Sequence, residues 1–111
     1  MEISTQKFKH CDLLSVIGKV DSFTAPDLTK AIEALNNENY FKIVLDLSKL
    51  EYMSSAGFRA LLLGQRNCKR FNRGEIVLAS VPKKVMDALE LTGFTPLFKI
   101  FDAITQAVGS F

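Results

Sequence analysis

The chain has 111 residues, of which 48% are hydrophobic and 23% are charged. This length fits a single domain spanning residues 1–111, and the composition is typical of globular proteins. The formal net charge of +2 is too close to balance to predict nucleic-acid binding. No stretch approaches the roughly 20 apolar residues of a membrane span, and the N-terminus has no apolar signal core. We therefore expect a soluble, cytoplasmic protein without membrane association.

The two cysteines, Cys11 and Cys68, lie far apart in the sequence and form no motif. One disulfide between them is a possible interpretation, but two reduced thiols are favoured in an intracellular protein. No Cys/His spacing fits zinc, so no metal site and no cofactor are predicted.

The first elements predicted are two strands joined by a short turn. Weak alternation over residues 3–9 favours an edge strand, and His10 begins a plausible tight turn. An apolar run over 13–17 predicts the second strand, which Gly18 is expected to end. The short connection predicts a hairpin.

A helix and a buried strand are predicted next. Thr24 is a suitable N-cap with Pro26 in the first turn, and apolar residues recur at helical spacing over 28–35. The apolar run over 41–47 predicts a central strand that is covered on both faces.

The second helix is predicted over 55–72. Phe58, Leu61 and Leu62 recur along one stripe, and Gly74 is a natural C-cap. Five cations lie between Arg59 and Arg73, mostly away from this stripe. A solvated helix face is favoured for them over a nucleic-acid patch.

The remaining sequence predicts two more strands and two more helices. A strand over 75–79 precedes a helix opened by Pro82 and ended at Thr92–Gly93, and a strand over 97–101 precedes a helix capped by Asp102. The element order ββαβαβαβα predicts an α/β domain. We expect a mixed, mostly parallel sheet of about five strands with about four helices.

Ligands and partners of such sheets meet the loops at the carboxyl ends of the strands. The segment YMSSAG is one such loop, and GKVDSFTAP is the other. Ser54 and Ser55 would lie at a helix N-terminus, where a hydroxyl can cap the helix or receive a phosphate. Phe23, in a polar segment, has two equal interpretations: a partner contact, or a staple onto the first helix.

No set of residues predicts catalysis. A serine nucleophile needs a base, and His10 is the single histidine, at a turn near the N-terminus. Phosphate-loop and dinucleotide motifs are missing. Asp21, Asp46 and Glu51 could meet near one rim, but acids at strand ends more often serve loops and caps than metals. An enzyme or nucleotide-binding protein is therefore the least favoured function.

Three segments make the chain similar to STAS domains, and above all to free-standing bacterial anti-sigma factor antagonists. GKVDSFTAPDL, IVLDLSKLEYMSSAGFRALL and LTGFTPLFKIF resemble the family's first conserved segment, its phosphoacceptor region and the segment before its last strand. With the matching element order, the resemblance spans nearly the whole chain.

The resemblance assigns residue roles at the family's Met-Asp-Ser-Ser/Thr-Gly site. Met53 and Gly57 match its ends, Ser55 falls on the phosphoacceptor serine, Ser54 replaces the acid, and Ala56 replaces the second hydroxyl. In the first segment, Asp21 matches the family's acid, and Lys19 replaces its glutamate. The residues expected to contact a partner are Asp21, Ser22, Phe23, Thr24, Met53, Ser54, Ala56, Gly57 and Arg59.

The function implied by the resemblance is partner switching without catalysis by this chain. The unmodified antagonist binds an anti-sigma factor that is also a serine kinase, and phosphorylation of Ser55 releases it. A PP2C-type phosphatase restores the unmodified form. The departures at Lys19, Ser54 and Ala56 keep an alternative open, namely a constitutive scaffold or transporter-associated subunit in which Ser55 only caps a helix. Both a monomer and a dimer are compatible with the sequence.

Overall fold

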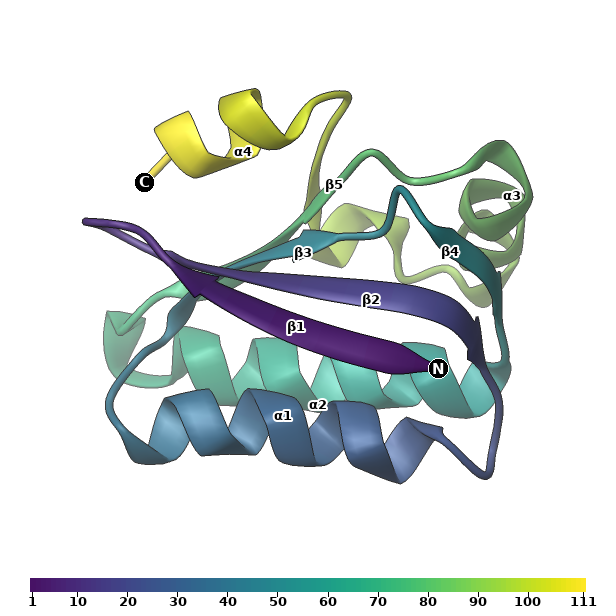
Figure 1. The fold of residues 1–111 in the computed structure, drawn as a ribbon, viewed down its shortest axis with the longest axis horizontal. Coiled ribbons are helices and arrows are strands. Elements are labelled where there is room, and N and C mark those ends of the chain that lie inside the picture. The colour runs from purple at the N-terminus through teal and green to yellow at the C-terminus, as the bar shows by residue number, and fades with distance from the viewer.

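Strands and helices alternate along the chain after an opening hairpin, and they assemble into one sheet with helices against both faces (Figure 1). The computed structural model describes residues 1–111. The strands are β1 (Glu2–Lys7), β2 (Asp12–Val20), β3 (Lys42–Asp46), β4 (Leu50–Met53), β5 (Glu75–Ala79) and β6 (Lys99–Phe101). The helices are α1 (Ala25–Asn37), α2 (Ser55–Lys69), α3 (Lys83–Thr92) and α4 (Ile104–Gly109), with short 3-10 turns η1 (Arg70–Asn72) and η2 (Thr95–Leu97).

The sheet has the order β1-β2-β3-β5-β6, and β4 pairs with β2 beside this path. Only the β1–β2 hairpin is antiparallel, whereas every other pair is parallel. Parallel neighbours require crossover connections, which the helices provide. The α/β class and the mixed, mostly parallel sheet predicted from the sequence are confirmed.

Residues of the central strands alternate between two cores. Ile43 and Leu45 of β3 belong to a cluster of 22 buried residues that also includes side chains of α1, α2 and α3. Val44 points to the other face, into a cluster of six buried residues that includes Ala107 of α4. Figure 1 shows α1 and α2 along one face of the sheet and α4 against the other. Burial on both faces explains why this strand is a continuous apolar run.

The expectation that Gly18 ends the second strand is wrong. Gly18 lies inside β2 with φ +95°, and the register of the β2–β4 pairing shifts between Gly18 and Lys19. A glycine tolerates this backbone conformation, so the strand bends there and continues to Val20. Its last residues pair with β4, a strand that sequence analysis missed because Leu50–Met53 is short and its two middle residues, Glu51 and Tyr52, are exposed.

The second helix is shorter than predicted. It ends at Lys69, and Phe71 and Asn72 have positive φ angles of 59° and 56°, which no continuing helix allows. Gly74 is therefore not a helix C-cap. A Cβ atom at this position would lie 2.3 Å from the carbonyl oxygen of Phe41, so the glycine permits two backbone segments to approach.

The C-terminal third differs from the expectation in two details. β6 begins at Lys99 rather than residue 97, because Thr95–Leu97 forms a 3-10 turn. Ala103, not Asp102, occupies the N-cap of α4, and no side chain caps that helix. The predicted end of α3 is confirmed, since Gly93 adopts a left-handed conformation after Thr92. No helix in the structure has the length and apolarity that crossing a bilayer would need.

Candidate functional site

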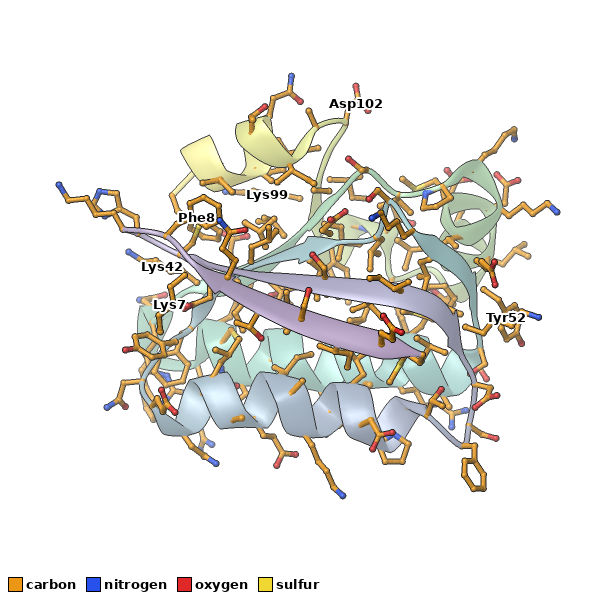
Figure 2. The ribbon with its side chains drawn as sticks, viewed as in Figure 1. Lys7, Phe8, Lys42, Tyr52, Lys99 and Asp102 are labelled. Atoms are coloured by element: carbon orange, nitrogen blue, oxygen red, sulfur yellow. The ribbon has the colours of Figure 1, made fainter.

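The pairing of β2 with β4 brings two loops together at one end of the molecule. Val20 lies opposite Met53 in this pairing, and the backbone N–H of Ser54 donates to the carbonyl of Val20 at 2.8 Å. The segment after β2 leads into α1, and Ser54 leads into α2. In Figure 2, Tyr52 marks this end of the molecule. Both loops that the sequence singled out therefore border a single surface.

The loop before α1 is held by its own hydrogen bonds. The Asp21 carboxylate accepts from the backbone N–H groups of Phe23 at 2.9 Å and Thr24 at 3.0 Å. Thr24 occupies the predicted N-cap position of α1, but its hydroxyl makes no capping bond. The hydroxyl oxygen instead accepts from the N–H of Asp21 at 2.9 Å. The N–H of Thr24, followed by that of Phe23, lowers the pKa of Asp21 because these donors favour the ionised carboxylate. The loop is thus fixed by an ionised side chain.

This fixed loop presents Phe23 to solvent. The side chain is 90% exposed, so it is not a staple on α1. An exposed aromatic ring on a rigid loop can anchor a protein interface at little entropic cost. Partner contact, the other interpretation of Phe23, remains a prediction.

The two adjacent serines have different environments. Ser54 is the N-cap of α2, and its hydroxyl oxygen accepts from the N–H of Gly57 at 3.4 Å. Ser55 is the first residue of the helix; it is exposed, and its hydroxyl makes no hydrogen bond. Because serine and aspartate are both good N-caps, Ser54 can replace the acid of the family pattern without loss of the cap. The capping role therefore falls to Ser54 and leaves Ser55 free.

Two of the residues expected to touch a partner lie beneath this surface instead. Met53 is 3% exposed, and Gly57 is buried. A Cβ atom on Gly57 would lie 2.5 Å from Cγ of Met53 and 2.9 Å from Cγ1 of Val20. These residues support the loop by close packing. The other expected contacts are at least partly exposed, namely Asp21, Ser22, Phe23, Thr24, Ser54, Ala56 and Arg59.

A shallow depression adjoins these exposed residues and was not foreseen from the sequence. It has a volume of about 460 Å³ and runs between α1 and α2. Leu63, which is 56% exposed, lines it together with Arg59 and Ala56. Helical spacing predicts the buried stripe of each helix, but the gap between two helices depends on how closely they pack.

The other candidate residues have structural roles. The Asp46 carboxylate accepts from the N–H of Ser48 at 3.0 Å and from the hydroxyl of Ser15 at 3.3 Å, as expected for an acid that serves a loop. Cys11 and Cys68 are free and buried in the two different cores, which confirms the prediction of two thiols. Burial raises the pKa of both thiols, so they stay protonated at neutral pH.

Comparison with known proteins identifies the family. The STAS domain model matches residues 2–107. BtrV of Bordetella bronchiseptica, which is named as an anti-sigma factor antagonist, is 29% identical over 111 residues, covering 100% of this chain and 95% of the relative. The anti-sigma-B factor antagonist of Listeria monocytogenes is 27% identical over 100 residues, covering 90% of this chain and 86% of the relative. A crystal structure of a Thermotoga maritima protein, also named as an anti-sigma factor antagonist, superposes with a TM-score of 0.90 at 23% identity and covers 97% of this chain and 92% of that one. The chain belongs to the STAS domain family.

Proposed function

We propose that this chain is an anti-sigma factor antagonist and that phosphorylation of Ser55 controls its binding to an anti-sigma factor. The observation that carries the proposal is the exposed Ser55 hydroxyl, which has no hydrogen-bond partner beside a serine that already caps the helix. The names of the relatives from Bordetella and Listeria support the class of partner.

The switch would act through charge. A phosphate on Ser55 adds nearly two negative charges. In the free protein, the N-terminus of α2 favours this charge, and the exposed Arg59 side chain, four residues further along the helix, can pair with it. Within an interface the same charge would lose its water, and without a further cation from the partner this desolvation costs several kcal/mol of binding. The modified chain would thus stay folded and release its partner.

The remaining components of the proposal follow from the family resemblance. The anti-sigma factor would also be the serine kinase that modifies Ser55, and a PP2C-type phosphatase would reverse the modification. The chain itself would bind and not catalyse, and it would act in the cytoplasm, where sigma factors act. Ser54 in place of an acid, next to Ser55, would change what the kinase recognises while keeping the helix cap.

A paired affinity capture tests the proposal. The baits are Ser55→Ala and Ser55→Asp, and Ser4→Asp serves as a control that adds the same charge on exposed β1. We expect an anti-sigma kinase from the source cell to bind the Ser55→Ala and Ser4→Asp proteins. Its affinity for Ser55→Asp should be weaker by about tenfold or more, the equivalent of at least about 1.4 kcal/mol. Equal recovery of one non-kinase partner by all three baits would instead support a constitutive scaffold.

A further inference from the structure

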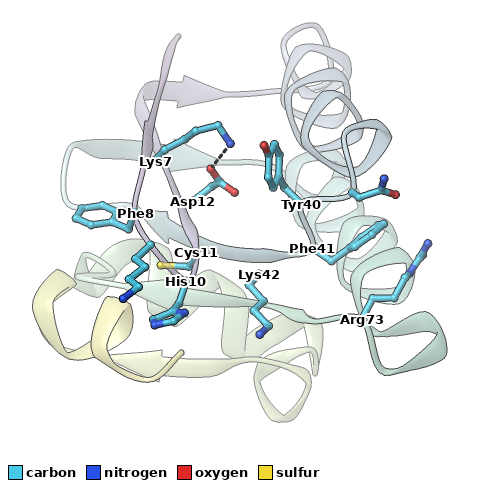
Figure 3. Close-up of a pocket in the computed structure, with 11 residues that line it drawn as sticks. Lys7, Phe8, His10, Cys11, Asp12, Tyr40, Phe41, Lys42 and Arg73 are labelled. Carbon is cyan, nitrogen blue, oxygen red and sulfur yellow. Dashed lines mark hydrogen bonds and ion pairs between the residues drawn. The ribbon is translucent and has the colours of Figure 1, made fainter.

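A cavity of about 270 Å³ lies at the end of the sheet opposite the Ser55 surface (Figure 3). Figure 2 places Lys7 and Lys42, which line it, at the opposite end of the molecule from Tyr52. Its wall comes from three separate parts of the chain, residues 7–12, 39–42 and Arg73. The parallel strands β3 and β5 both begin near this edge, so the loops that enter them converge. None of the residues proposed to contact the anti-sigma factor lines this cavity.

The cavity wall carries an excess of positive charge. Lys7, Lys9, Lys42 and Arg73 line it, together with a single carboxylate, that of Asp12. Asp12 is 3% exposed, and its Oδ1 lies 3.2 Å from Nζ of Lys7, so these two charges offset each other. The other three cations form no salt bridge. A concave wall with three cations outside any salt bridge attracts anions.

Two of the cations are held in place by aromatic rings. The guanidinium of Arg73 lies 3.8 Å from the ring centre of Phe41, and it donates to the carbonyls of Arg70 at 3.0 Å and Asn67 at 2.6 Å. The ammonium of Lys7 lies 3.2 Å from the ring centre of Tyr40. These contacts fix the side chains but neutralise neither charge. Of the three cations outside any salt bridge, Arg73 is therefore the one whose position the structure fixes.

We propose that this cavity binds a small phosphate-bearing ligand with at least two negative charges, held by Lys9 and Lys42, while Arg73 adds positive charge from another side of the wall. Lysine and arginine side chains together are typical phosphate binders. The volume is just below the roughly 300–1,000 Å³ of sites for drug-sized molecules, which limits the ligand to one or two phosphate groups on a small body. Inorganic pyrophosphate and a phosphorylated small metabolite share this chemistry. The proposal is independent of phosphorylation at Ser55.

Titration of the full, isotope-labelled chain with inorganic pyrophosphate, followed by NMR at low salt, tests the site. We expect saturable shifts confined to the amides of residues 7–12, 39–42 and 73. The double variant Lys9→Gln/Lys42→Gln should bind about tenfold more weakly or worse, since it removes two positive charges that attract the phosphate. The matched control Lys30→Gln/Lys84→Gln removes two exposed lysines from α1 and α3 and should bind as the native chain does.

A variant that is expected to bind pyrophosphate more tightly distinguishes an effect on binding from an effect on folding. Asp12→Asn removes the single carboxylate of the wall and frees the charge of Lys7, so it should tighten binding of pyrophosphate. Weaker binding by this variant, with an unchanged amide spectrum elsewhere, would count against the proposal.

Further ligands identify the source of the phosphate. Tighter binding of glycerol 3-phosphate than of pyrophosphate would indicate a metabolite, and the reverse order would indicate an inorganic ligand. Either result supports the site. The proposal would be overturned by shifts spread over all basic residues or by an equal loss of affinity in the control Lys30→Gln/Lys84→Gln. Binding of a DNA duplex at these residues without binding of pyrophosphate would also overturn it.

Discussion

The two ends of the sheet differ in how their charged side chains are paired. At the end with Ser55, the loop carboxylate of Asp21 is satisfied by backbone donors of its own loop, and the exposed feature is the apolar ring of Phe23. At the other end, Lys9, Lys42 and Arg73 line a cavity and form no salt bridge. The first end is a rigid surface that suits a protein, and the second is a concave site that suits an anion.

The difference has a structural cause. The Ser55 end forms where β2 and β4 pair side by side, so short loops are tied to strand ends by hydrogen bonds. The opposite end is formed by the turn between β1 and β2 and by the segments that lead into β3 and β5, and tight backbone approaches such as Gly74 against Phe41 hold them. A change at either end should therefore act by a different physical route.

The largest expected effect is on the packing of the cavity end. A Cβ atom in Gly74→Ala would clash with the backbone of Phe41 at 2.3 Å, and backbone cannot move aside easily. We expect a loss of about 3 kcal/mol in the free energy of unfolding, measured by urea denaturation. Gly57→Ala, whose Cβ would meet side chains of Met53 and Val20, should lose less, about 1–2 kcal/mol.

Gly109→Ala is the control for both glycine variants, since nothing lies within 4 Å of a Cβ added there. A loss of stability in Gly109→Ala as large as in Gly74→Ala would contradict the packing argument.

The next effect concerns Phe23, and it should appear in binding but not in stability. The ring is 90% exposed, so Phe23→Ala should change the free energy of unfolding by less than about 0.5 kcal/mol. If the ring anchors the partner, its loss should cost about 2 kcal/mol of binding to the captured anti-sigma factor, measured by calorimetry. Phe71→Ala removes a ring that is 79% exposed at the cavity end and should leave that affinity unchanged. Equal losses of affinity for the anti-sigma factor in Phe23→Ala and Phe71→Ala would contradict the assignment of partner binding to the Ser55 end.

A smaller effect separates the two serines. Ser54→Ala removes the hydroxyl that caps α2 and should lower the free energy of unfolding by about 1 kcal/mol, whereas Ser54→Asp should keep the cap. Ser55→Ala removes an unbonded hydroxyl and should leave stability nearly unchanged. Thermal denaturation of the three variants measures this order. A larger loss in Ser55→Ala than in Ser54→Ala would reverse the assignment of the cap.

The smallest effect is the pH dependence from Asp21. Its pKa is lowered in the folded chain, first by the N–H of Thr24, so the ionised form stabilises the fold. This stabilisation is present above the pKa of the unfolded chain, about 3.9, and is lost as the pH falls through the lower folded value. Asp21→Asn should therefore lose stability relative to the native chain at pH 6, and the difference should shrink in acid. The control is Asp102→Asn, at an exposed residue whose carboxylate makes no hydrogen bond. A stability difference between Asp21→Asn and the native chain that grows in acid would contradict the stabilising role of the ionised Asp21.

Much of the fold could be predicted because its signals are local. The apolar run of β3 predicts burial on both faces, and the spacing over 28–35 predicts the buried face of α1. The strand β4 was missed because four residues with two exposed side chains carry too weak a pattern. The end of α2 was misplaced because Gly74 resembles a cap, while the chain leaves the helix earlier at the left-handed Phe71.

The candidate site was predicted only in part for a related reason. The segments containing Asp21 and Ser55 were both identified, but periodicity does not tell which hydroxyl caps a helix. Nor does it show that Met53 faces the core. The resemblance to the family supplied the position of Ser55, whereas hydrogen-bond geometry separated it from Ser54.

By itself, the sequence determined the order of the elements other than β4, the faces that they bury and the loops that lie at the strand ends, because each depends on residues within a few positions of one another. The tertiary structure alone decided two further features. It joined the two loops through the hydrogen bond from Ser54 to Val20, and it brought three separate segments together around a basic cavity. These depend on strand pairing and on packing between distant residues, which local periodicity does not encode.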